Sequence, residues 1–398
     1  MTRELIPFRV VDAEGNEHKL MYSSPYEVEG YDERRVLKSN PWFEHGKPTK
    51  NWMLHETDFY DEVDKIWGKK WGAEGIGRLR EVLVSRPTEN ETRSEYAEEW
   101  QYYYSTSGGK ANLSRLQEQF EEYYGVLKKN GVRVNFVDPP VPAIGPYGYL
   151  KNLVTLAGGG LVAKGGAIIH RMGLGSWQRG REVIWTKALT ALGVPIYLTI
   201  HGRGVAEPGA GRWLDSRHFV FNESVVCNEE GLEQMNFILQ RQGIELIVAH
   251  SPGWINSIGD GNIGTSHADM FLMAADLGVV VLYPSLVNYS FVRYLQRMKF
   301  RIIEVPPDEY WDLAVNGVTL EPGKVIINKG SPKTAKALAK EGIDVLQVDF
   351  SESQKFAVAG LHCATLELIR DQPGPLLEET QSRLGKESKG LPVRPPKT

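Results

Sequence analysis

Residues 318–350, VTLEPGKVIINKGSPKTAKALAKEGIDVLQVDF, contain the pattern from which the fold can be predicted. The apolar stretch 318–328 predicts strands, residues 331–341 predict a helix, and residues 345–350 predict a further strand. Gly342 stands directly after the helical stretch, where a residue in the left-handed conformation commonly ends a helix. The stretch therefore predicts one unit in which strands are followed by a helix and a returning strand.

The same order recurs upstream at intervals of roughly fifty residues, which is the signature of an internal structural repeat. Helices between strand-like runs are predicted at 111–130, 181–192, 230–242 and 287–298. Gly131, Gly193 and Gly243 repeat the glycine turn after a helix. Strands are predicted at 79–87, which opens the first unit, and at 153–156, among others. Five units indicate radial repetition rather than an open, doubly wound sheet.

Three segments are predicted along the chain. Residues 1–78 carry Trp42, Trp52, Trp67 and Trp71 but few alternating apolar runs, so we interpret them as an N-terminal extension. Its tryptophans are either packing anchors or a cover for the active site. Residues 79–372 form the main domain. The Lys- and Pro-rich residues 373–398 are interpreted as a C-terminal tail, most simply disordered.

The composition limits the classes of function. A net charge of -4 argues against nucleic acid as the main partner, because phosphate binding normally leaves a basic surface. The N-terminus lacks a signal-peptide pattern, and no run approaches the roughly 18 apolar residues of a membrane span. Two cysteines form neither a disulfide framework nor a cysteine-based zinc site. We expect a cytoplasmic protein.

Two short elements carry reactive side chains. One is Gly360-Leu361-His362-Cys363-Ala364-Thr365, and the other is Ser266-His267-Ala268-Asp269. A thiol, an imidazole and a carboxylate on separate segments are the groups that thiol-based covalent catalysis requires. The alternative for Cys363 is a buried, unreactive side chain, which is our interpretation of Cys227. A metal site at His267 and Asp269 lacks a third ligand at a recognisable spacing.

The order of these elements resembles the pentein superfamily, which includes arginine deiminases, dimethylarginine dimethylaminohydrolases and glycine amidinotransferases. The resemblance covers about residues 79–372. It rests on the first strand, on Lys151-Asn152-Leu153, Arg171 to Glu182, Glu207-Pro208-Gly209-Ala210, His267-Ala268-Asp269 and Gly360 to Thr365. It implies an α/β fold, a five-bladed propeller of ββαβ units with an N-terminal extension.

The resemblance also implies a role for each residue. Cys363 would attack the central carbon of a guanidino group and form an amidino-thioether, while His267 would move protons to the leaving amine and from water. Glu207 would orient His267, and Asp269 would bind guanidinium nitrogens. Asn152 stands where family members carry a guanidinium-binding aspartate, which removes one negative charge from the pocket. An asparagine there recurs in the family's arginine and succinylarginine dihydrolases.

Several nearby residues have weaker assignments. Arg203, in the loop that leads to Glu207, is a candidate substrate-binding residue. His362 is interpreted as structural, because in an extended chain it would point away from Cys363. Arg171, Arg179 and Arg181 are either carboxylate ligands or surface residues. Gly158-Gly159-Gly160 is interpreted as a turn between strands and not as a phosphate loop, since it lacks the Lys-Ser/Thr ending.

Three functions follow from these observations. The leading hypothesis is a hydrolase of guanidino or amidine C–N bonds, of the deiminase or dihydrolase type. The second is an amidinotransferase, in which an amine replaces water. The third is a catalytically silent pentein-fold binding protein. The expected partner is a small guanidino compound, with no nucleic acid, membrane, metal or cofactor; a homo-oligomer is compatible with the sequence.

Overall fold

The computed structural model describes residues 4–11, 13–24, 44–47, 58–92, 111–150, 152–173, 178–251 and 267–371. Trp42, Trp52, Lys151, Ser266 and the predicted tail 373–398 lie outside these residues. The chain divides into two compact units, Met1–Lys70 and Trp71–Thr398.

The first unit contains a hairpin and a helix. β1 (Glu4–Val11) pairs antiparallel with β2 (Glu17–Ser24). α2 (Phe59–Trp67) begins at Asp58, whose side chain accepts a hydrogen bond from the backbone of Tyr60 at 2.8 Å. It ends at Gly68, which has a left-handed φ of 81°. These are the ordinary start and stop signals of a short helix.

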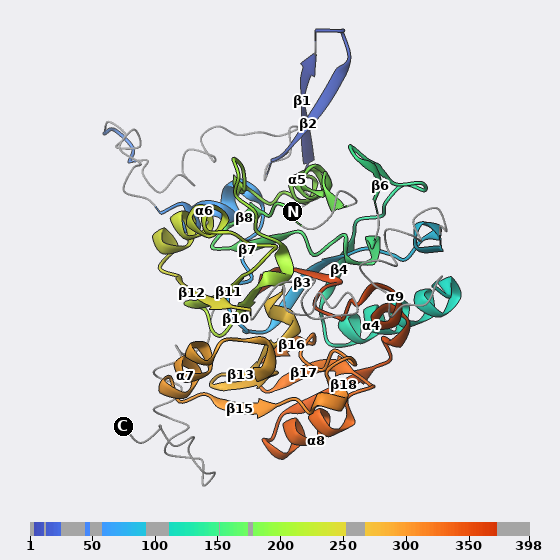
Figure 1. The fold of residues 1–398 in the computed structure, drawn as a ribbon. Helices are drawn as coiled ribbons and strands as arrows, with labels where there is room; N and C mark the ends of the chain where they lie inside the picture. Colours follow the sequence, from blue (N-terminus) through green and yellow to red (C-terminus); the bar gives the residue numbers. More distant parts are fainter. Residues whose placement is uncertain are drawn as a thin grey trace. The chain divides into compact units, whose positions relative to one another are not determined.

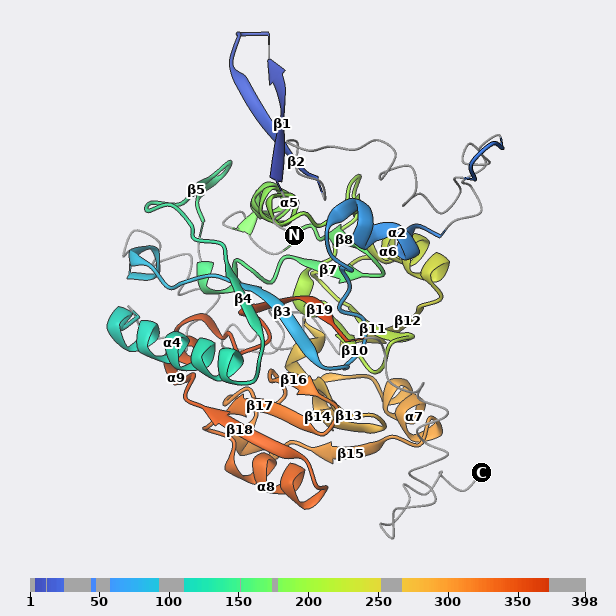
Figure 2. The same ribbon diagram turned by 180° about the vertical axis from the view of Figure 1, so that it is seen from behind.

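The described residues of the second unit form five three-stranded sheets with one shared pattern (Figures 1 and 2). In each sheet the first strand pairs antiparallel with the middle strand, and the middle strand pairs parallel with the third. In order, the sheets are β19 (Thr365–Arg370), β3 (Leu79–Val84) and β4 (Arg133–Phe136); β7 (Gly160–Ala163), β8 (Gly166–Ile169) and β9 (Ile196–Thr199); β10 (Gly211–Trp213), β11 (His218–Glu223) and β12 (Glu245–His250); β13 (Leu272–Asp276), β14 (Val279–Leu282) and β15 (Arg301–Glu304); and β16 (Val318–Glu321), β17 (Lys324–Asn328) and β18 (Asp344–Val348).

A helix joins the two parallel strands in every sheet, as a parallel connection requires. These helices are α4 (Leu113–Lys129), α5 (Arg181–Leu192), α6 (Glu229–Leu239), α7 (Tyr289–Arg297) and α8 (Pro332–Lys340). α4 buries Leu116, Phe120, Tyr123 and Leu127 on one side, which is the stripe that its spacing predicts. The repeat of strands, helix and strand is therefore confirmed in all five units.

Strands of several neighbouring sheets contact one another, and most of these are first strands. β19 contacts β7, β13 contacts both β10 and β16, and β16 contacts β3. The first sheet combines β3, from the start of this unit, with β19, from its end, so residues almost 300 positions apart share one sheet. The strands β8, β14 and most of β17 are buried along their length, which fits their continuous apolar sequence.

Shorter elements connect the sheets. β5 (Ile144–Gly145) and β6 (Gly148–Tyr149) form a small hairpin, and α9 (Ser351–Ala357) leads to the cysteine turn. The 3₁₀ helices are η2 (Glu89–Thr92), η5 (Leu153–Thr155), η7 (Pro208–Ala210), η8 (Gln240–Gln242), η10 (Ala268–Met270), η11 (Pro284–Leu286) and η12 (Pro307–Glu309). In the part of the chain described here, no helix has the length and apolar character to cross a bilayer.

Two details differ from the sequence predictions. The predicted strand at 153–156 is wrong, since the segment forms η5, preceded by Asn152 with a left-handed φ of 54°. That conformation turns the chain and cannot continue a strand. The second unit also begins at Trp71, before the predicted boundary at 78. Trp71 is fully buried, and Gly72 forms a β-bridge with Ile369.

Candidate active site

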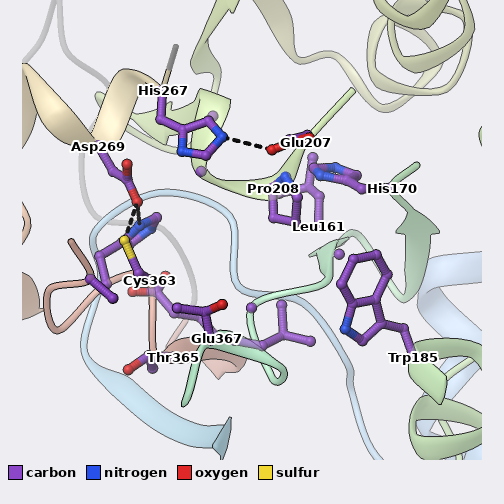
Figure 3. A pocket seen from close by; sticks show the side chains of 18 of the residues that line it. Leu161, His170, Trp185, Glu207, Pro208, His267, Asp269, Cys363, Thr365 and Glu367 are labelled. Carbon is purple, nitrogen blue, oxygen red and sulfur yellow. Dashed lines mark hydrogen bonds and ion pairs between the residues drawn. The ribbon is translucent and has the colours of Figure 1, made fainter. Parts of the chain in front are cut away.

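A cavity of about 120 Å³ in the second unit collects most of the predicted site residues. Cys363, His267, Glu207 and Asp269 line it (Figure 3). Asn152 lines it as well. These residues come from turns and 3₁₀ helices that connect the strands. Functional side chains commonly stand on such connecting segments, which the strands hold in place. Among the described residues, no three His, Cys, Asp or Glu side chains are grouped to hold a metal ion.

Cys363 lies in a tight turn between α9 and β19. Asn316 holds this turn: its Oδ1 accepts hydrogen bonds from the backbone N–H groups of His362 (3.1 Å) and Cys363 (3.2 Å), and its Nδ2 lies 3.1 Å from Cys363 Sγ. Asn316 also donates to the carbonyl oxygen of Asp269 at 3.1 Å. Gly360 is required here, because a Cβ at that position would lie 2.5 Å from Asn316 Oδ1.

Asp269, in η10, connects the thiol to a histidine. Its Oδ2 lies 2.9 Å from His362 Nδ1 and 3.3 Å from Cys363 Sγ. Burial alone would raise the pKa of Asp269, but the hydrogen bond to His362 and nearby positive charges hold that pKa below its usual range. Asp269 is therefore ionised, while its other oxygen, Oδ1, is buried with no partner among the described residues.

The thiol of Cys363 is protonated at rest. Burial is the main cause that raises the pKa of the Cys363 thiol well above its ordinary value, and the negative charge of Asp269 raises it further. The hydrogen bond from Asn316 acts in the opposite direction and lowers the pKa. The thiolate is the reactive form of cysteine. Catalysis would therefore require the thiol to lose its proton within the pocket. We call Asp269, Asn316, His362 and Cys363 the thiol side of the cavity.

His267 and Glu207 form the second pair. His267 Nε2 lies 3.0 Å from Glu207 Oε2, and the other carboxylate oxygen accepts a hydrogen bond from the backbone of Gly173 at 2.8 Å. Burial alone would lower the pKa of His267, but the hydrogen bond and charge of Glu207 raise it above its usual value. A Cβ at Gly209 would lie 3.0 Å from His267 Nδ1, so this glycine leaves that nitrogen accessible.

Buried charged side chains lie close to the thiol side of the cavity. Arg212 donates to the carbonyl oxygens of Leu272 (3.0 Å) and Gly317 (3.1 Å), and its charge acts on both Asp269 and Cys363. Glu367, at the cavity floor, forms a two-point ion pair with Arg370. A buried arginine near Asp269 stabilises the ionised carboxylate.

Apart from Arg181, the described side chains that line the opposite part of the cavity are uncharged. We call Asn152, Leu161, His170 and Trp185 the neutral wall; the last three are labelled in Figure 3. Trp185 packs on Gly159, where a Cβ would overlap its ring. This contact explains Gly159, whereas a Cβ at Gly158 or Gly160 would approach the carbonyl oxygen of Cys363 (2.8 Å) or Ile168 (3.0 Å).

Arg181 lines the cavity beside the neutral wall and holds Asn152 in place. Its guanidinium donates to the carbonyl oxygen of Asn152 at 3.0 Å and to the hydroxyl of Thr155 at 3.2 Å. These bonds hold Asn152 in its left-handed conformation. The amide Oδ1 of Asn152 is buried with no partner in the described structure.

Known proteins are similar to this chain in sequence and in fold. Residues 283–370 match the arginine deiminase family model. The chain is 28% identical over 371 residues to 2-nitroimidazole nitrohydrolase from Mycobacterium sp. (strain JS330), an alignment that covers 89% of this chain and 97% of that protein. It is 26% identical over 258 residues to N(G),N(G)-dimethylarginine dimethylaminohydrolase from Pseudomonas aeruginosa, covering 65% of this chain and 90% of that one. The chain is thus similar in sequence to a nitrohydrolase and to a dimethylarginine dimethylaminohydrolase, and over residues 283–370 to the arginine deiminase family.

A solved structure supports the fold. The N-terminal domain of ArgZ, an arginine dihydrolase from cyanobacteria, is similar with a TM-score of 0.59 at 17% identity. The match covers 74% of this chain and 98% of that domain. The second unit thus has the α/β fold of solved pentein enzymes.

Two predictions about the site residues need correction. Arg203 is exposed and does not line the cavity, because its loop turns outward and its backbone bonds to Glu230. His362 does not point away from Cys363, because residues 361–364 form a turn and not an extended strand. It lines the same cavity and shares Asp269 with the thiol.

The structure also places the three arginines Arg171, Arg179 and Arg181. Arg179 is half-buried and does not line the cavity. Arg181 is buried, so the surface alternative is wrong for it. Arg171 donates to the carbonyl oxygens of Gly202 (2.6 Å) and Gly204 (3.0 Å) and does not line the cavity. The second cysteine, Cys227, is buried as predicted, and burial raises the pKa of its thiol.

Sequence reasoning missed Asn316, Arg212 and His170. Asn316 sits two residues before β16 in no recognisable motif, so nothing in the sequence indicates that it reaches the thiol. Arg212 follows the Glu207 element, and a charged residue inside an apolar strand could have marked it. His170 closes an apolar run, where a histidine usually has a packing role.

Proposed function

We propose that this protein is a cysteine-dependent hydrolase of a C–N bond at a carbon atom flanked by nitrogens, as in guanidino and amidine groups. The observation that carries the proposal is one cavity in which Cys363 lies beside Asp269, opposite a His267–Glu207 pair. We further propose that the second unit is the catalytic domain and that its five sheets are arranged as a five-bladed propeller. The contacts between neighbouring first strands support this arrangement.

The first half of the reaction forms a covalent intermediate. The proton of the Cys363 thiol passes to His267, and the thiolate attacks the electron-poor carbon to form a C–S bond. The adduct collapses when the C–N bond breaks and the protonated His267 gives its proton to the leaving nitrogen. Asp269 Oδ1 is free to accept a hydrogen bond from a substrate N–H group throughout.

The second half releases the product. His267 takes a proton from water, and the hydroxide adds to the carbon of the thioether intermediate. The C–S bond then breaks, a urea-type product leaves, and the proton returns to Cys363. Glu207 stabilises the imidazolium form of His267 in both halves, consistent with the raised pKa of that histidine.

Two leaving groups are candidates. Dimethylarginine hydrolysis, named for the Pseudomonas relative, would release dimethylamine, and arginine would release ammonia. The relative that aligns over 97% of its length is a 2-nitroimidazole nitrohydrolase, which favours nitrite as a second candidate leaving group. In both cases the attacked carbon lies between nitrogen atoms, so the same residues serve. Nitrite leaves as an anion, so with 2-nitroimidazole His267 would give the thiol proton to a ring nitrogen of the adduct before nitrite departs, and the neutral imidazole could then accept a proton from water.

The test is a substrate comparison with the wild-type protein and the Cys363→Ser variant. Arginine, dimethylarginine and 2-nitroimidazole are each incubated with enzyme, and ammonia, dimethylamine and nitrite are measured. We expect one of these products from the wild type and none above background from the variant. Ornithine that appears only with an added amine acceptor would instead indicate an amidinotransferase. No product, and no adduct of a haloacetamidine on Cys363, would indicate a binding protein.

A further inference from the structure

His170 is a buried polar side chain that makes no hydrogen bond to any described residue. It follows β8 directly and is only 1% exposed, yet neither ring nitrogen has a hydrogen-bond partner in the part of the chain described. Its ring meets Phe221 edge-on, with centroids 5.8 Å apart. Buried polar groups without partners are rare in native proteins, and each calls for an explanation.

The ring lies at the cavity, which supplies that explanation. His170 lines the cavity between Leu161 and Glu207, as Figure 3 shows. Burial lowers the pKa of His170 to about 3, so the imidazole is neutral at physiological pH. A neutral imidazole offers one N–H donor and one nitrogen acceptor. A bound ligand could therefore satisfy either nitrogen.

A second unpartnered group lies in the same wall. The amide Oδ1 of Asn152 is buried and has no partner among the described residues. Trp185 and Leu161 supply apolar surface beside it. The neutral wall thus combines a donor, two acceptors and flat apolar contacts, and it carries no negative charge.

A cationic amino acid would find few complements on this wall. Of the arginines and lysines in the described structure, only Arg181 lines the cavity, and it donates to Asn152 and Thr155. A substrate carboxylate would need a cationic partner, and a guanidinium would prefer carboxylates. Among the described residues, three carboxylates line the cavity. Asp269 already shares one oxygen with His362 and Cys363, Glu207 is paired with His267, and Glu367 is paired with Arg370.

We propose that His170 hydrogen-bonds to the non-reacting edge of the substrate and selects an uncharged, planar azole ring, with Asn152 contacting the same ring. This inference rests on the proposed function, since it names the substrate class of the same cavity. The azole lies between the neutral wall and the thiol side, with the carbon between its two nitrogens facing Cys363.

Binding is measured by calorimetry in the Cys363→Ser background, so that turnover plays no part. The probes are 2-nitroimidazole and arginine. We expect 2-nitroimidazole to bind at least about tenfold more tightly than arginine, and His170→Leu to weaken its binding about tenfold or more, because a site built for hydrogen bonds loses affinity when one is removed. His170→Gln, which keeps a donor and an acceptor, should recover much of the loss.

Thermal melting separates recognition from a structural role. We expect His170→Leu to melt at or above the temperature of the parent, since it removes buried polar atoms that lack partners. The inference is overturned if 2-nitroimidazole fails to bind, if arginine binds more tightly, or if His170→Leu lowers stability while leaving affinity unchanged. Failure of the proposed function appears separately, as absence of product from the wild type.

Discussion

The thiol side and the neutral wall face one cavity but are built in opposite ways. On the thiol side almost every polar group is paired: Asn316 makes hydrogen bonds to His362, Cys363 and Asp269, and Asp269 Oδ2 contacts two side chains. On the neutral wall, His170 and the Asn152 amide oxygen have no partners among the described residues. Bonds within the protein fix the geometry of reacting groups, whereas unpaired groups are available to a ligand.

The difference also concerns charge. Asp269, Glu367, Arg212 and Arg370 surround the thiol, and the balance of their charges sets the pKa values there. The neutral wall contributes a histidine whose charge is suppressed by burial. Under the proposed roles, the reaction chemistry and the choice of substrate depend on different residues, so we expect mutations to change them independently.

The largest expected effect is on the thiol itself. Cys363→Ser should reduce kcat/KM by about 10⁴-fold or more, because a serine hydroxyl in this buried site lacks the nucleophilicity of a thiolate. Ligand binding at the neutral wall should persist. Cys227→Ser is the control, since that cysteine is buried in the core and does not line the cavity. Equal loss of activity in both variants would contradict the assignment.

Glu207→Gln should have the next largest effect. We expect kcat/KM to fall about 10²-fold, because the substitution removes the carboxylate that orients His267. The Glu207 charge raises the pKa of His267, so its loss lets burial lower that pKa. The part of the pH dependence of kcat/KM that reflects titration of His267 should therefore shift to lower pH. Measuring kcat/KM over a series of pH values tests this.

The control for Glu207 is Glu223→Gln. Glu223 lies 3.0 Å from His250, the same type of pair, but both side chains are exposed. This variant should leave the pH profile unchanged. An unchanged profile in Glu207→Gln as well would show that His267 is not the group that titrates.

Asp269→Asn separates thiol reactivity from turnover. The negative charge of Asp269 raises the pKa of Cys363, so its removal should lower that pKa and increase the thiolate fraction near pH 8. We expect iodoacetamide to alkylate Cys363 about tenfold faster, while hydrolysis falls because a substrate ligand is lost. Mass spectrometry after timed alkylation measures the first effect.

Asp215→Asn is the matched control for this experiment. Asp215 is also buried and also bonds to a histidine, His218, at 2.8 Å, but it does not line the cavity. The Asp215→Asn variant should be less stable than the wild type, but the rate at which Cys363 is alkylated should not change. Slower alkylation in Asp269→Asn would contradict the charge argument.

The fold was largely predictable because its signals are local. Glycines after helices and apolar periodicity identified all five repeats, and Cys363, His267 and Asp269 stand in short, recognisable elements. The pairing of β19 with β3 and the reach of Asn316 to the thiol are not local, since they join residues that only the folded chain brings together. His362 was misjudged because extended geometry was assumed where residues 361–364 form a turn.

The smallest expected effect concerns Asn152, at the neutral wall. Asn152→Asp places a carboxylate where the wall has an unpartnered amide oxygen, in nearly the same volume. A negative charge favours a cationic ligand, so we expect the ratio of arginine to 2-nitroimidazole affinity to rise about tenfold. Measuring both ligands on the Cys363→Ser background provides the control, because any general loss of folding cancels in the ratio. A ratio that stays the same would mean that Asn152 does not contact the ligand, and that the charge of the wall does not set the choice between the two substrate classes.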